Sequence, residues 1–253
     1  MTELLLHQFP ISHFCEKVRW LLDARGLPYR IKNQFPGLHA AANRKLVGAA
    51  TVPVLIHAGH AVGDSSAIAR YLDQHFTSWQ AVPGDPAQRE QVLALEREFD
   101  ESAGVHGRRY MYSFVLRDPR LFHRLFFAEY GLVARTLGGL AVGVLRKKIS
   151  ALYRTGTRGA EESGAIVERA FERVEALTDG DPARYLLGER LTLADVTAAS
   201  LLAPMVGPPG TPWGQDPELP ELRAMRERAR VRPAGKWVLA RYTRDRRGVH
   251  GSR

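Results

Sequence analysis

The stretch TVPVLIHAGHAVGDSSAIARYL, residues 51–72, decides how the first third of this chain folds. Residues 54–56 are strand formers. Pro53 cannot donate a hydrogen bond to a ladder, so we expect it at the start of that strand. A turn containing glycine and a very short second strand, 60–62, follow. The stretch therefore predicts a hairpin that runs directly into a helix.

That helix begins at Asp64 and Ser65, and its apolar face carries Ile68, Leu72 and Phe76. We expect the first-turn amides to lie uncovered beside the acidic side chain of Asp64. Such a site suits a zwitterion, because the amides bind its carboxylate and Asp64 binds its ammonium group.

Earlier residues complete a β-α-β-α-β-β-α order, which is the thioredoxin-like arrangement. The expected elements are a buried strand, a helix, a second strand and a short helix, at 4–8, 12–22, 29–32 and 39–46. Gly26 ends the first helix. We expect the first two strands to be parallel and the last two to form a hairpin.

Helical patterns fill the chain after 81–86, a linker rich in proline and glycine. Apolar residues recur at helical spacing in 87–115, 121–152, 160–177 and 194–205. The last of these is nearly all apolar, which predicts the buried centre of an all-helical part. Thr192, with Asp195 three residues later, is a variant of the capping box and therefore a structural motif.

Composition limits the partners and the compartment. The chain has 253 residues and a net charge of +9. Residues 220–253 hold eleven Lys and Arg against three Asp and Glu, a balance of +8. Nucleic acid or an anionic membrane would explain this excess, but few aromatic residues interleave the charges, so a solvated basic tail is favoured and no nucleic acid is expected.

The single cysteine, Cys15, allows no intrachain disulfide and fits a reducing cytoplasm. The N-terminus shows no signal peptide, and no apolar stretch is long enough to be a transmembrane segment.

Three motifs resemble the glutathione S-transferase superfamily: the Val52–Pro53 step, the Asp64–Ser65 pair and the Leu-Thr-x-Ala-Asp box at 191–195. The resemblance is weak from 100 to 160 and in the last thirty residues. It implies a thioredoxin-like glutathione-binding domain at 1–80, a linker at 81–86 and an all-helical substrate domain at 87–253. It also implies a cis Val52–Pro53 bond, no metal, and a homodimer formed through 71–79 and 87–112.

The same resemblance implies that Val52, Pro53, Asp64 and Ser65 bind glutathione, which serves as co-substrate. Whether the thiol is glutathione or another small thiol stays open.

The family activates the thiol near the start of the first helix. Tyrosine-type members place Tyr where this chain has Gln8. Serine-type members have a Ser three residues before a Cys, and Ser12 and Cys15 match this spacing. The chain therefore resembles a serine-type, theta-like or omega-like bacterial member. The catalytic candidate is Ser12, with helix capping as its alternative role. Cys15 is expected in the core and His13 at the rim of the site, partly exposed.

Two departures bear on the site. Thr51 stands where many members have a Lys that contacts glutathione, which leaves Lys45 or Arg44 as substitutes. The cluster 108–112, RRYMY, matches no family signature. Its Arg and Tyr side chains are candidates for contact with an anionic or aromatic electrophile, or for an interface or plain surface.

The leading hypothesis is a glutathione transferase that attacks a small hydrophobic electrophile, a detoxification reaction in this family. The first alternative is a protein of the same fold that binds glutathione or a hydrophobic ligand without turnover. The second is an isomerase similar to the prostaglandin synthase branch, although that branch has Cys at the position of Ser12.

Overall fold

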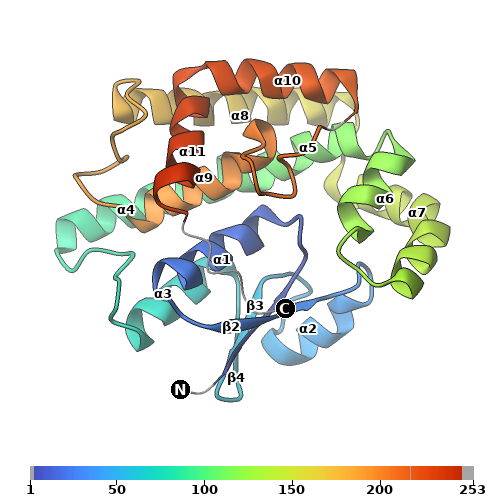
Figure 1. The fold of residues 1–253 in the computed structure, drawn as a ribbon, viewed down its shortest axis with the longest axis horizontal. Helices are drawn as coiled ribbons and strands as arrows, with labels where there is room; N and C mark the ends of the chain where they lie inside the picture. The colour runs from blue at the N-terminus through green and yellow to red at the C-terminus, as the bar shows by residue number, and fades with distance from the viewer. Residues whose placement is uncertain (1–2, 217, 247–253) are drawn as a thin grey trace.

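The computed structural model describes residues 3–216 and 218–246. A small sheet with its helices forms one layer, and a larger all-helical part lies against it (Figure 1). The strands are β1 (Leu4–Gln8), β2 (Tyr29–Asn33), β3 (Val54–His57) and β4 (His60–Gly63). Their order is β2-β1-β3-β4, with β1 and β2 parallel and the other pairs antiparallel. The predicted parallel pair and hairpin are both confirmed.

Three helices accompany the sheet: α1 (His13–Ala24), α2 (His39–Val47) and α3 (Ser65–His75). Helix α1 buries Cys15, Val18 and Leu22 completely, so these three residues form its core-facing side. The Val52–Pro53 bond is cis, as expected. This part is the thioredoxin-like domain of the predicted fold class.

The remaining helices form the second domain, and they are α4 (Pro86–Phe99), η1 (Asp100–His106), α5 (Gly107–Val115), α6 (Pro119–Phe127), α7 (Leu132–Tyr153), α8 (Thr157–Thr178), α9 (Leu193–Val206), α10 (Pro220–Val231) and α11 (Pro233–Arg244). One expectation is corrected: the first long helix contains the π-helical segment η1. The region 121–152 is helical, as expected, and consists of two helices. Phe127 and Tyr130, on either side of the end of α6, contact the ring of Phe35.

Helix α9 is the centre of the helical domain, as predicted, and every one of its residues is buried. It packs against α1, α4 and α11. The capping box is present: Asp195 accepts hydrogen bonds from the amides of Thr192 at 2.9 Å and Leu186 at 2.7 Å. Burial raises the pKa of Asp195 to about 6, although these amides favour its charged form. The structural role predicted for this motif is confirmed.

The segment that leads from α3 to α4 is held at its start. The Asp73 carboxylate at the end of α3 accepts hydrogen bonds from the amides of Ala81 and Val82, both at 2.9 Å. The Ala81 carbonyl in turn accepts from the amide of Leu193, at the start of α9, at 2.8 Å. Ala81 is therefore bonded both to the end of α3 and to the start of α9.

The basic C-terminal region is not the solvated tail that the sequence favours. Arg226 and Arg241 are buried, and the Arg241 guanidinium lies 4.3 Å from the ring centre of Tyr185. Arg246 pairs with Glu16 and Asp23 on α1. These cations are used inside the fold; residues 247–253 of the predicted tail lie outside the described part.

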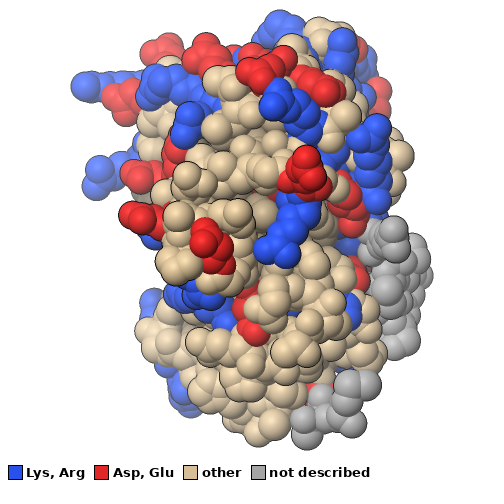
Figure 2. All heavy atoms as spheres, turned by 90° about the vertical axis from the view of Figure 1, so that its left-hand side faces the viewer, with Lys and Arg blue, Asp and Glu red and all other residues tan. Residues whose placement is uncertain are grey.

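Charge is unevenly spread over the surface. On the face in Figure 2, charged side chains gather over the upper, helical domain and are sparse over the lower part. Among the described residues, no helix is both long enough and apolar enough to cross a membrane.

Candidate functional site

The sheet register brings three of the predicted site segments to one edge. His7 pairs with Val54 on β3, and Val54 pairs with Gly63 on β4. The residues one step beyond these positions are Gln8, Pro53 and Asp64, so they leave the sheet at the same end. Ser12 follows β1 by a short turn at that end. The start of α1, the cis proline and the start of α3 are thus neighbours.

Ser12 is the N-cap of α1. Its backbone is extended (φ −78°, ψ 119°), and its hydroxyl oxygen accepts a hydrogen bond from the amide of Cys15 at 3.3 Å. The side chain is half-buried. A hydroxyl that accepts a capping bond keeps its own proton to donate, and it lies at the positive end of the helix. This geometry can stabilise an anion beside Ser12.

Cys15 lies in the core, as the sequence predicts, and is fully buried. Burial raises the pKa of its thiol, which opposes formation of a thiolate there.

The expectation that His13 lies partly exposed at the rim is wrong. Its side chain is buried, and its Nε2 lies 3.1 Å from the Gly104 carbonyl oxygen in the π-helical segment. Burial, with the Arg108 charge nearby, lowers the pKa of His13 to about 3. The cause is the approach of η1 to α1, which no local pattern around His13 indicates.

The Asp64 carboxylate binds amides that were expected to bind the carboxylate of a ligand. Its Oδ1 accepts hydrogen bonds from the amides of Ser66 and Ala67, both at 3.0 Å. The expectation that the first-turn amides are uncovered is therefore wrong for these two, because the acidic residue is itself the N-cap. The carboxylate is exposed, and Oδ2 takes no part in the cap.

The backbone of Asp64 is strained, with φ at +70° in a residue other than glycine. Such strain tends to persist at ligand-binding positions. Ser65 beside it is buried.

A buried polar cluster lies behind the start of α3. Lys17 of α1 contacts Glu96 at 2.7 Å and Asp100 at 2.9 Å, and the Ser66 hydroxyl lies within hydrogen-bond distance of both carboxylates. Burial alone would raise the pKa of Glu96, but Lys17 outweighs it and holds that pKa below its usual range. The pKa of Asp100 is raised, chiefly by burial. The cluster joins α1, α3 and the helical domain at this edge.

The two departures from the family pattern are seen directly. Gln8 is buried, and its side chain contacts Asn33 and Arg19, so it is part of the packing rather than a free group. The Thr51 carbonyl accepts from Asn43 of α2 at 2.8 Å. The last turn of α2, which carries Arg44 and Lys45, both exposed, therefore lies next to the cis proline.

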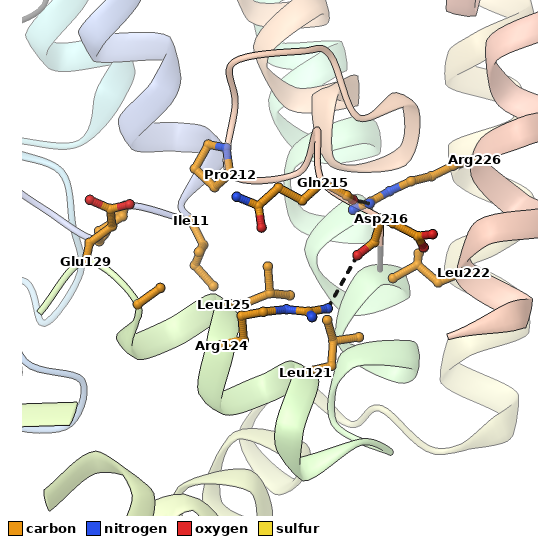
Figure 3. Close-up of a pocket in the computed structure, with 12 residues that line it drawn as sticks. Ile11, Leu121, Arg124, Leu125, Glu129, Pro212, Gln215, Asp216, Leu222 and Arg226 are labelled. Atoms are coloured by element: carbon orange, nitrogen blue, oxygen red, sulfur yellow. Dashed lines mark hydrogen bonds between the residues drawn. The ribbon is translucent and has the colours of Figure 1, made fainter. Parts of the chain in front are cut away.

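A small cavity of about 60 Å³ lies beside the turn before Ser12, between the two domains (Figure 3). Ile11 forms one wall, and α6, the loop before α10 and α10 itself form the others. Arg124 reaches across it to the Asp216 carbonyl, at 3.4 Å, and pairs with Glu218 at 2.6 Å. Sequence reasoning missed these residues because α6 and the 208–219 loop are about ninety residues apart.

The predicted cluster 108–112 does not line this cavity. The guanidinium of Arg108 lies 4.5 Å from the ring centre of Tyr153 and 5.7 Å from that of Phe14. Arg108, at the start of α5, therefore lies close to α1 and to the last residue of α7.

A thioredoxin-like domain followed by an all-helical domain, with a cis proline and a capped acidic residue at the shared edge, defines the class of protein. Residues 6–80 match the sequence profile of the glutathione S-transferase N-terminal domain. No curated protein matches the chain. The profile match over residues 6–80 and the shared fold of the whole chain support the resemblance to the glutathione S-transferase superfamily.

Solved structures show the same fold over nearly the whole chain. The theta class glutathione S-transferase of Xanthomonas axonopodis pv. citri, with glutathione bound, is 25% identical, with a TM-score of 0.54 and coverage of 94% of this chain and 98% of that one. A glutathione S-transferase of Ceriporiopsis subvermispora, in complex with glutathione, is 17% identical (TM-score 0.66; 98% and 99% covered). A beta-etherase from a Sphingobium strain is 21% identical (TM-score 0.60; 94% and 98% covered).

Proposed function

We propose that this protein binds glutathione at the edge formed by α1, the cis proline and α3, and directs the thiol at a small hydrophobic electrophile. The observation that carries the proposal is the sheet register, which brings the end of β1, Pro53 and Asp64 to one edge, with Ser12 a short turn beyond β1. Val52 and Pro53 would pair with the cysteinyl part of the ligand, and Asp64 and Ser65 would hold its γ-glutamyl end. Glutathione-bound neighbours of the same fold support this ligand.

In this proposal Ser12 is the catalytic residue of a serine-type, theta-like enzyme. Its hydroxyl donates to the glutathione sulfur, and the α1 dipole adds to the stabilisation of the thiolate. The sulfur then forms a bond to the electrophile, and the electrophile's leaving group departs with the bonding electrons. The cavity beside Ile11 would receive the electrophile; its small volume suits a small group.

The test is a comparison of Ser12→Ala and Cys15→Ala. Loss of a hydrogen bond to a charged sulfur should raise the pKa of bound glutathione and lower turnover of a dinitro-aryl chloride about 10- to 100-fold. Glutathione affinity, measured by calorimetry, should change little. Cys15→Ala is the matched control, expected to keep turnover and to cost on the order of 1 kcal/mol of stability. A dead Cys15→Ala with an active Ser12→Ala would overturn the assignment.

A second candidate is a glutathione-binding protein of this fold without turnover. The hydrogen bond that the Ser12 hydroxyl accepts from the Cys15 amide favours it, since helix capping alone explains a serine at this position. Glutathione binding without turnover in the wild-type chain would select this candidate. The isomerase alternative is less favoured, because that branch has Cys at the position where this chain has Ser12.

We also propose a homodimer, a boundary between the domains at 81–86, and a cytoplasmic location. A partly exposed cluster of aromatic rings supports the dimer surface at 71–79. The ring centre of Tyr71 lies 4.0 Å from that of His75 and 5.7 Å from that of His60 on β4, and both pairs are stacked. Light scattering at micromolar concentration should give twice the 28.2 kDa chain mass, and a monomer would contradict the dimer.

A further inference from the structure

Helix α7, at the right of Figure 1, carries an exposed apolar stripe. The stripe is defined by four residues at i, i+4, i+7 and i+11, and their exposed fractions are 74%, 56%, 82% and 59% for Val133, Leu137, Leu140 and Val144. This spacing puts them on one helical face. The helix carries more exposed aliphatic surface here than scattered single residues would give.

The opposite face of α7 is packed, so the stripe points away from the protein. Gly138 lies against Phe127 of α6 so closely that a Cβ there would come within 2.5 Å of the ring. Val142 is buried on the same side, and Leu145 contacts the loop at Gly37. The orientation of the stripe therefore follows from the packing of α7.

The charge around the stripe is of one sign. Helix α7 has no Asp or Glu, and it carries Arg135, Arg146, Lys147 and Lys148. By helical geometry, Lys147 and Lys148 fall on the two sides of the stripe, one turn beyond Val144. From 117 to 154 the chain holds eight Lys and Arg against two Asp and Glu, a balance of +6. The region of α6 and α7 is therefore a second strongly basic part of the chain, besides residues 220–253.

These features favour one kind of occupant. A second copy pairing through the stripe would bring basic α7 against basic α7, in either direction, with no acid on the helix to offset the repulsion. Single-stranded nucleic acid stacks its bases on aromatic side chains, and a duplex is bound through charged contacts to its phosphates, so an exposed aliphatic stripe serves neither. An apolar face bordered by lysines is the pattern of a helix lying in the interface of an anionic bilayer.

We propose that α7 docks this protein onto an anionic membrane surface. The stripe enters the boundary between headgroups and acyl chains, and the flanking lysines contact lipid phosphates. The helix lies on the bilayer rather than crossing it, in keeping with the absence of a spanning helix in the described residues. The proposal does not depend on glutathione binding.

The test is cosedimentation of the full chain with vesicles of phosphatidylcholine alone and vesicles containing about one third phosphatidylglycerol. We expect preferential binding to the anionic vesicles, weakened by salt. Leu140→Glu should lower the partition coefficient about tenfold or more, because it places an acid in the stripe. The double variant Lys147→Gln/Lys148→Gln should also lower it about tenfold and reduce the salt dependence.

Val231→Glu is the matched control, since Val231 is also an exposed aliphatic residue (69%) but lies at the end of α10. It should bind vesicles like the wild type. Wild-type protein that stays in the supernatant at millimolar lipid would overturn the proposal. So would equal partitioning of wild type and Leu140→Glu, or a drop in oligomeric state by Leu140→Glu without any vesicle binding, which would assign the stripe to a second copy.

Discussion

Asp64 combines a structural and a proposed ligand-binding role in one carboxylate. One oxygen caps α3, and the other takes no part in that cap. Its positive φ and its exposed carboxylate support the ligand-binding role proposed above. The two roles can be separated, because the cap needs only an acceptor, whereas a bound ammonium group benefits from charge.

Replacement of Asp64 should therefore affect two measurements. Asp64→Ala should weaken glutathione binding by roughly 1.5–3 kcal/mol, the range for a hydrogen bond to a charged group. It should also lower the free energy of unfolding by about 1 kcal/mol through loss of the cap. Asp64→Asn should keep most of the stability and lose affinity. Calorimetry and chemical denaturation measure the two effects.

Asp85 supplies the matched control, because it caps α4 in the same manner, accepting from the amide of Gln88 at 2.9 Å. Asp85→Ala should lose similar stability and leave glutathione affinity unchanged. Unchanged affinity in Asp64→Ala would exclude the γ-glutamyl role.

At the scale of elements, Lys17 joins α1 to α3 and α4. It is fully buried and neutralises part of the charge of two carboxylates. Removal of a buried partner leaves charge uncompensated, so Lys17→Met should lower the free energy of unfolding by about 3–5 kcal/mol at neutral pH. Lys45→Met, at an exposed site on α2, is the control and should change little.

The free energy of unfolding of Lys17→Met should also depend on pH differently from that of the wild type. Without Lys17, burial raises the pKa of both Glu96 and Asp100, so the folded protein holds protons that the unfolded chain releases. Stability of the variant should then rise as pH falls from 7 toward 5, and its deficit against the wild type should narrow. Denaturation curves across this range measure it. A deficit that stays constant with pH would argue against buried charge as its cause.

The elements were predictable where the signal is local. Strand 4–8 and the cap Ser12 are set by hydrophobic runs and capping residues, which act within a few residues. The segment η1 was not predictable, because π-helical and α-helical turns are similar in composition and differ in their backbone hydrogen bonds. Its contact with His13 of α1 joins residues that are distant in the sequence.

The candidate site shows the same division. Its cis proline and its acidic N-cap were found from short motifs, since each acts through its own neighbours. The cavity wall from α6 and the Arg124 contact depend on how distant segments fold together. The burial of Arg241 and the ion pairs of Arg246 were missed for that reason also: composition counts charges but does not show which have partners inside the fold.

At the scale of the whole molecule, a series of side-chain contacts connects the end of the described chain to the candidate site. Arg246 contacts Glu16 at 2.8 Å, and Glu16 also binds Arg19 at 2.8 Å. Arg19 reaches the carbonyl of Pro10 at 3.3 Å and the side chain of Gln8. This series of ion pairs and hydrogen bonds connects the C-terminal helix to the turn before Ser12, so the helical domain helps to hold the loop that carries the proposed catalytic residue.

The pinned linker has a consequence for how ligands would meet this protein. Asp73 and Leu193 fix both sides of Ala81, which leaves the domains little freedom to swing apart. A ligand that contacts both domains would then meet surfaces that are already in position, and the protein would lose little conformational entropy when the ligand binds. Selectivity would come from the fixed shape between the domains, with closure around the ligand contributing little.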